Sequence, residues 1–190
     1  MASHDVQTVA DPGRRGELGG SLARVLADGG HLEKAQEMVT RIHDPLHRPG
    51  AGFHVAMTLW FSHDDLEGAE REARRIDDPH LRALALATLS GAHALAGHDV
   101  RARELVAEVE AAIDSVDLPD KRLGVIARLV PAVTVIDGVA AAEDLISGRL
   151  RDKFVVEGMG HLARTLAHTD MDHALAVAWS MDEDRDAVIG

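Results

Sequence analysis

Small and apolar residues recur along the chain at the three- and four-residue spacing of a helix that buries one face. Ala35, for example, is followed by Met38, Val39 and Ile42. The same order of small and apolar residues follows Ala69 and Ala102. This periodicity predicts an all-α protein.

A phrase containing this pattern repeats at a nearly constant interval. It reads DGGHLEKAQEMV at 28–39, SHDDLEGAEREA at 62–73 and LAGHDVRARELV at 95–106, and it returns in weaker form as DGVAAAEDLI and TDMDHALAVA. The anchoring residues of the five copies are 34, 33, 40 and 32 residues apart, and the interval of 40 contains an insertion, DSVDLPD. The anchors are Ala35, Ala69, Ala102, Ala142 and Ala174. A period in the low thirties is typical of arrays of helix pairs.

Another apolar segment with helical spacing precedes each copy of the repeated sequence. The preceding helix and the helix that begins in the repeated sequence together predict a helical hairpin. The turns are expected near 29–31, 63–65, 97–99, 136–138 and 168–171, where glycine can end one helix and aspartate can cap the next. Pro45 and Pro79 lie between repeats, where proline stops a helix or starts one. Pro131 lies inside the first helix of the fourth repeat and should kink or interrupt it.

The repeat length, the anchoring alanine and the small or apolar residue four places later resemble the tetratricopeptide-like repeats over roughly residues 17–183. The aromatic residues usual in the first helix of that family remain only as Phe53 and Trp60. The resemblance implies a right-handed α-solenoid of about five antiparallel helix hairpins. We expect residues 1–16 to form a flexible lead-in and residues 17–190 a single helical-repeat domain.

Composition and charge argue against some classes of partner and location. The formal net charge is −12, and the basic residues do not cluster, which argues against nucleic acid as a partner. Glu67 with Arg71, and Glu70 with Arg74, are spaced as ion pairs on a solvated helix face. The chain has no cysteine, no signal-peptide core and no apolar run of membrane-spanning length, so we expect a soluble, cytoplasmic protein.

The candidate chemical motifs have simpler explanations. Gly158-x-Gly160-x-x-Ala163 matches a dinucleotide fingerprint, but the repeat places it in a helix. Asp64-Asp65-Leu66-Glu67 is explained by helix capping. Of the 12 histidines, His31, His63, His98 and His168 fall at or beside turns. We expect most histidines to be solvated or to have local hydrogen bonds, although His161, His168 and His173 could gather. We therefore predict no catalytic residue, no metal and no cofactor.

The resemblance implies that the first helices of successive repeats line a concave groove. By position, its polar part would contain Arg24, Asp28, His54, Thr58 and Phe61. The equivalent later positions are small: Ala87, Gly91, Ala94, Ala127, Thr134 and Ala163. Two classes of function stay open. The first is an interaction module, a scaffold or a regulatory sensor segment that binds a peptide or partner helix in the groove. The second is a small-molecule-binding protein or enzyme with histidines as ligands or acid–base groups.

The last repeat ends in apolar residues that no later helix of the sequence covers: Val177, Trp179, Met181 and Ile189. A solenoid normally has a polar outer face on its terminal repeat. We therefore expect a homodimer, or a contact with another protein, through the C-terminal repeat. The expected partners are proteins or peptides, with no nucleic acid and no membrane.

Overall fold

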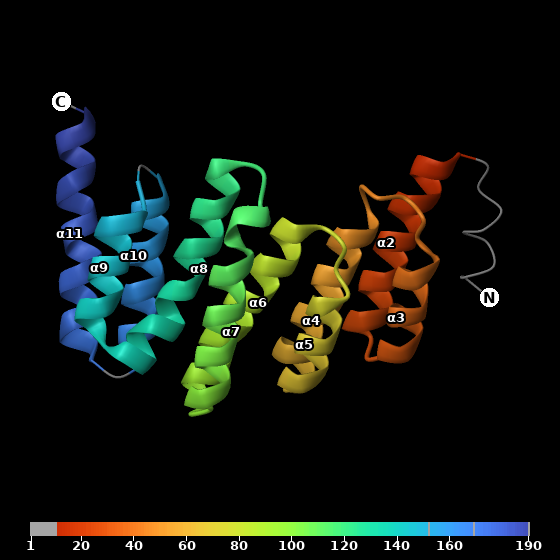
Figure 1. The fold of residues 1–190 in the computed structure, drawn as a ribbon, viewed down its shortest axis with the longest axis horizontal. Coiled ribbons are helices and arrows are strands. Elements are labelled where there is room, and N and C mark those ends of the chain that lie inside the picture. Colours follow the sequence, from red (N-terminus) through yellow and green to blue (C-terminus); the bar gives the residue numbers. More distant parts are fainter. Residues whose placement is uncertain (1–10, 152, 169, 190) are drawn as a thin grey trace. The chain divides into compact units, whose positions relative to one another are not determined.

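The computed structural model describes residues 11–151, 153–168 and 170–189, with side-chain burial described as far as position 180 (Figure 1). Over these residues the chain forms ten α-helices and one short 3-10 helix, with no β-strand. The prediction of an all-α protein is confirmed. No helix in the described ranges combines the length and the hydropathy needed to cross a bilayer.

The chain divides into two compact units, residues 1–86 and 87–190, with the boundary inside one helix. The first unit contains α2 (Pro12–Asp28), α3 (Leu32–Arg41), α4 (Arg48–His63), α5 (Leu66–Arg74) and the first half of α6 (Pro79–Leu95). Here α2 packs on α3, α4 packs on α5, and α2 and α4 contact each other. These contacts match two successive hairpins of the predicted repeat.

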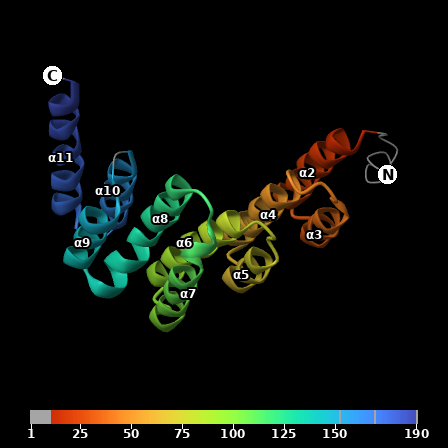
Figure 2. The ribbon, with the colours of Figure 1, turned by 45° about the horizontal axis from the view of Figure 1, so that its top comes forward.

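The second unit begins with the end of α6 and continues through α7 (Asp99–Ala112), the 3-10 helix η1 (Ile113–Ser115), α8 (Pro119–Asp137), α9 (Val139–Arg149), α10 (Lys153–Leu166) and α11 (Met171–Ile189). Helix α8 packs on α9 and α10 packs on α11, while α8 and α10 also contact each other (Figure 2). An apolar cluster of this unit joins α8, α9, α10 and α11 and includes Ile126, Ile146, Phe154 and Leu162. A single domain in the form of a right-handed stack of five hairpins stays a prediction.

Three hairpin turns repeat one backbone geometry. Gly30 and Gly97 have φ of 77°, and Asp64 has φ of 54° at the matching position. Each of the three lies five residues before an anchoring alanine. This left-handed conformation suits glycine because a Cβ is crowded there, and aspartate is among the few other residues that tolerate it. The turns therefore lie where the sequence predicts them.

The anchoring alanines lie at the helix contacts. Ala35, Ala69, Ala102 and Ala142 have no exposed surface, and Ala174 is 5% exposed. Ala102 on α7 belongs to a small cluster with Ala94 of α6 and Ala132 of α8. Alanine lets helix backbones approach closely, so a larger side chain at these positions has no space. The predicted burial of the anchors is confirmed.

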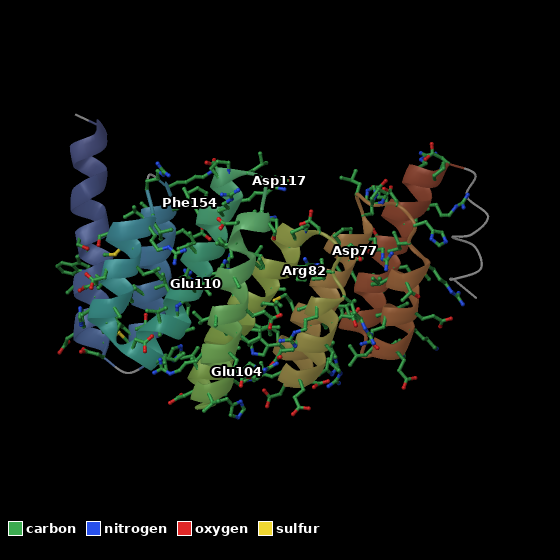
Figure 3. The ribbon with its side chains drawn as sticks, viewed as in Figure 1. Asp77, Arg82, Glu104, Glu110, Asp117 and Phe154 are labelled. Atoms are coloured by element: carbon green, nitrogen blue, oxygen red, sulfur yellow. The ribbon has the colours of Figure 1, made fainter. Side chains whose placement is uncertain are left out.

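A second recurring motif connects one hairpin to the next. The segments IDDPHLR at 76–82 and VDLPDKR at 116–122 share a buried aliphatic residue, a proline three places later and an arginine three places after that. Arg82 Nη1 donates to the carbonyl oxygen of Ile76 at 2.9 Å, and Arg122 Nε donates to that of Val116 at 2.5 Å. The arginine thus satisfies a carbonyl left free after the preceding helix. Figure 3 labels Arg82, Asp77 and Asp117 of these junctions.

Two details differ from the expectations. Helix α2 begins at Pro12, because Asp11 caps it by accepting from the backbone N–H of Arg14 at 2.8 Å. Residues 12–16 are therefore helical rather than part of a flexible lead-in, and positions 1–10 lie outside the described residues. Pro131 does not interrupt α8, which runs unbroken from Pro119 to Asp137.

The burial of Ala69 and Ala102 gives a direct test of the helix packing. Changing either to Leu should overpack the contact and lower the free energy of unfolding by about 1–3 kcal/mol. Ala107→Leu, at an exposed position of α7, is the control and should change the stability by less than about 0.5 kcal/mol. Chemical denaturation measures all three. Equal stability of the three variants would contradict this packing.

Candidate binding surfaces

In the first unit, a contact between a histidine and an aspartate connects the first helices of the two hairpins. Asp28 Oδ1 at the end of α2 lies 3.0 Å from His54 Nε2 in the middle of α4. The side chains are 59% and 36% exposed, so water screens the interaction and it contributes little to stability. Arg24, one turn before Asp28, is also exposed. The structure thus brings three of the five predicted groove residues to the surface of α2 and α4.

The last turn of α4 exposes an aromatic side chain. Phe61 is 70% exposed, and its ring centroid lies 3.9 Å from that of the half-buried Trp60. Thr58, also predicted for the groove, is only 6% exposed and therefore belongs to the interior. Periodicity places Thr58 on the same side of α4 as Phe61. It does not show which part of that side the neighbouring helices cover.

The charged second helix of the second hairpin is more buried than expected. Glu70 and Glu72 on α5 are 4% and 3% exposed, so of the two predicted pairs only Glu67 with Arg71 lies on a solvated face. Glu72 accepts from Gln36 Nε2 of α3 and from Arg75 Nη1, each at 3.2 Å. Glu70 accepts from Arg74 Nη1 at 2.9 Å. The buried carboxylates are paired, as burial of charge requires.

In the second unit, a polar cluster lies where α8 meets α10. Glu157, His161 and Arg164 are spaced along one stripe of α10, and Arg128 comes from α8. Arg164 Nη2 lies 2.9 Å from His161 Nδ1. Glu157 Oε1 lies 3.6 Å from Arg128 Nε and 3.8 Å from His161 Nε2. We call these four residues the α8–α10 cluster.

The geometry of the α8–α10 cluster defines the state of His161. Because a guanidinium can only donate, Nδ1 must accept and the ring proton of the neutral imidazole lies on Nε2. The imidazole is 7% exposed. Its burial, followed by the positive charges of Arg128 and Arg164, lowers the pKa of His161 to about 4. His161 is therefore neutral at pH 7, and it is a hydrogen-bonding group inside a partly exposed charged surface.

The sequence analysis did not single out Arg128, Glu157 and Arg164. At the groove positions of the later first helices it predicted small residues instead. That expectation was wrong: Ala87, Gly91, Ala94, Ala127 and Thr134 are buried, and Ala163 is partly buried. A Cβ on Gly91 would lie 3.0 Å from Pro131 Cβ, so glycine is required there for the close approach of α6 to α8. The spacing of Glu157, His161 and Arg164 was the signal available in the sequence.

Four other histidines lie at or beside the turns, as predicted. His31, His63, His98 and His168 are exposed. His161, His168 and His173 do not gather, because His161 contacts Arg164 whereas His173 Nε2 lies 4.0 Å from Glu143 Oε1 of α9. In the described part of the chain, no three His, Cys, Asp or Glu side chains are placed to hold a metal ion.

The remaining motifs are helical or capping residues. Gly158 and Gly160 lie within α10, so they cannot form the strand-to-helix loop that a dinucleotide fingerprint requires. Asp65 Oδ1 caps α5 by accepting from the backbone N–H of Gly68 at 2.7 Å.

The predicted C-terminal interface residues differ in exposure. Val177 is buried in the apolar cluster of the second unit, whereas Trp179 is 73% exposed. The side chains of Met181 and Ile189 lie outside the described residues.

Comparison with known proteins gives no family. No protein-family model matches the chain, and no curated protein matches it. The structure is similar to the crystal structure of Ton1535 from Thermococcus onnurineus NA1, with a TM-score of 0.49 and 17% sequence identity. The similarity covers 89% of this chain and 55% of that one, so the chain spans about half the length of that protein.

The lowered pKa of His161 predicts a pH dependence of stability. The unfolded histidine, with a pKa near 6.5, takes up a proton before the folded one does, so stability is lost as pH falls from 6.5 to about 4. The loss amounts to up to about 3 kcal/mol. Urea denaturation at pH 7 and pH 4 should show a larger decrease for the wild type than for His161→Gln. Equal decreases would contradict the buried, neutral imidazole.

The scattered histidines predict no specific response to zinc. Equimolar zinc should leave the melting temperature unchanged, since a ligand stabilises the native state only by binding to it. Calorimetry with and without a chelator is the measurement. A stoichiometric stabilisation that the chelator reverses would show a metal site.

Proposed function

We propose that the chain is a right-handed α-solenoid of five tetratricopeptide-like hairpins that acts as a protein-interaction module. In this proposal it is a cytoplasmic scaffold or regulatory sensor segment, and its first helices bind a peptide or a partner helix in a concave groove. The contacts of α2 with α4 and of α8 with α10 support the proposal. In each case a first helix lies against the first helix of the following hairpin, as a continuous groove requires.

The single observation that carries the proposal is the exposure of Phe61. Its ring is 70% exposed although its neighbour Trp60 offers a stacking partner, so folding leaves most of its apolar surface in water. Aromatic side chains of this kind supply much of the energy of protein interfaces when a partner covers them. Phe61 also lies on the same helix as His54, whose contact with Asp28 offers polar groups about two turns away.

The α8–α10 cluster favours a second candidate, a protein that binds a small molecule. A neutral His161 beside Arg128, Arg164 and Glu157 could bind a polar ligand or transfer a proton. Arg164 already occupies the acceptor nitrogen of His161 at 2.9 Å, and the proton-bearing Nε2 is buried. A ligand therefore meets the arginines and the glutamate rather than the imidazole. This arrangement favours binding over acid–base catalysis.

The interaction module is tested by a matched pair of variants. Phe61→Ala removes the exposed ring, and Leu46→Ala removes a comparably exposed side chain, 78% exposed, from the loop before α4. Proteins retained from native lysate by the wild type are identified, and their affinities are then measured by calorimetry. Phe61→Ala should weaken binding by about fivefold or more, and Leu46→Ala by less than twofold.

The outcome against the proposal is equally specific. A partner that binds wild type and Phe61→Ala with the same affinity would show that the ring is not part of the interface. If small carboxylates or phosphates instead raise the melting temperature of the wild type but not of Arg128→Gln, the second candidate is favoured.

A further inference from the structure

The last helix exposes an apolar stripe on the side away from its own hairpin. Met171, Leu175 and Trp179 follow one another at four-residue intervals on α11 and are 56%, 48% and 73% exposed. Ala174 and Val177 face the other way and are each 5% exposed within the core. No described helix covers the stripe.

The first hairpin has a cleft of about 390 Å³ between the N-terminal half of α2 and the end of α3. Its floor is apolar and contains Gly16, Gly19, Met38 and Ile42. Charged and polar groups stand at its edge: Arg15, Arg41, His43 and Asp44. The volume falls within the range of pockets that enclose small ligands, and it is sufficient for an indole ring and a neighbouring aliphatic side chain.

Contacts inside the chain show how these two ends could fit together. The second helix of one hairpin packs against the first helix of the next, as α3 does on α4, α7 on α8 and α9 on α10. Helix α11 is a second helix with its outer side exposed, and α2 is a first helix with an open cleft beside it. Helix α11 of one molecule therefore offers the element that the α2–α3 cleft of another can receive in the same packing.

Charge favours the same match. The sequence of α11 contains five acidic residues and one arginine. The cleft is lined by Arg15, Arg41 and the carboxylate of Asp44, and Arg41 also pairs with Glu37 of α3. Two α11 helices facing each other would bring like charges together, whereas the cleft offers the acidic helix two arginines beside its own carboxylates. The favoured occupant of the cleft is thus α11 of a second copy.

We propose that copies of this chain associate head to tail, with the α11 stripe of one molecule bound in the α2–α3 cleft of the next. The contact is heterologous, since two different surfaces meet, and each complex keeps one free stripe and one free cleft. Association can therefore continue beyond a dimer. The contact uses the ends of the chain rather than the first-helix groove, so it is independent of peptide binding.

Two variants disable one surface each. Trp179→Glu places a charge in the stripe and leaves the cleft intact, whereas the double variant Arg41→Glu/His43→Glu reverses the charge of the cleft and leaves the stripe intact. Val100→Glu is the matched control, because Val100 on α7 is 75% exposed and belongs to neither surface. Circular dichroism and melting temperature establish that all three are folded.

Light scattering across a concentration series is the measurement. The wild type and Val100→Glu should show a mass that rises with concentration above 20.4 kDa. Trp179→Glu alone, and Arg41→Glu/His43→Glu alone, should stay at that mass over the concentrations at which the wild type assembles. Half-assembly of either variant should require at least about tenfold higher concentration. An equimolar mixture of the two should give twice 20.4 kDa and nothing larger, because one intact stripe meets one intact cleft. Phe61→Ala should assemble as the wild type does.

Three results would overturn the proposal. A monomeric wild type at millimolar concentration would show that the ends do not bind each other. Assembly of the Arg41→Glu/His43→Glu variant alone, but not of Trp179→Glu, would indicate a symmetric contact through α11. A mixture that stays monomeric while the wild type assembles would show that stripe and cleft are not partners.

Discussion

The close approach of helix backbones at the anchoring alanines is the constraint on which the rest of the structure depends. Ala35, Ala69, Ala102 and Ala142 have no exposed surface, and each lies on a second helix, in the turn after the hairpin bend. A methyl side chain brings the two helices of a pair into contact along their length, where many weak dispersion contacts add up. With aromatic residues at only 3% of the chain, stability depends on such small-residue contacts more than on large buried rings.

The connections follow from that packing. A left-handed residue five positions before the anchor, Gly30, Asp64 or Gly97, lets the chain reverse in a short turn and fixes the side of the second helix that faces the first. At the other end of the repeat, Arg82 and Arg122 satisfy the carbonyls of Ile76 and Val116. In each junction a proline, Pro79 or Pro119, lies between the buried aliphatic residue and the arginine. It starts the next helix and has no N–H that would need a partner there.

The carboxylates of Glu70 and Glu72 that are buried between the helices are paired, whereas His161 Nε2 is buried without a hydrogen bond. Glu72 connects α3 to α5 through Gln36, so it helps to hold two second helices in position. His161 is neutral beside Arg128 and Arg164, whose side chains are partly exposed on α8 and α10. The exposed charges and Phe61 of the first helices are therefore open to solvent, whereas the buried polar groups help to position the helices.

The sequence by itself determined the helices, the turns and the anchors, because these follow from local periodicity, left-handed turn residues and caps such as Asp65. It also located Asp28, His54 and Phe61 on exposed parts of their helices. It did not show that Thr58, Glu70 and Glu72 are buried, or that Arg128 meets the α10 stripe of His161. Those facts depend on which neighbouring helix covers each face. Residues far apart in the sequence decide that coverage, and no spacing within one helix reports it.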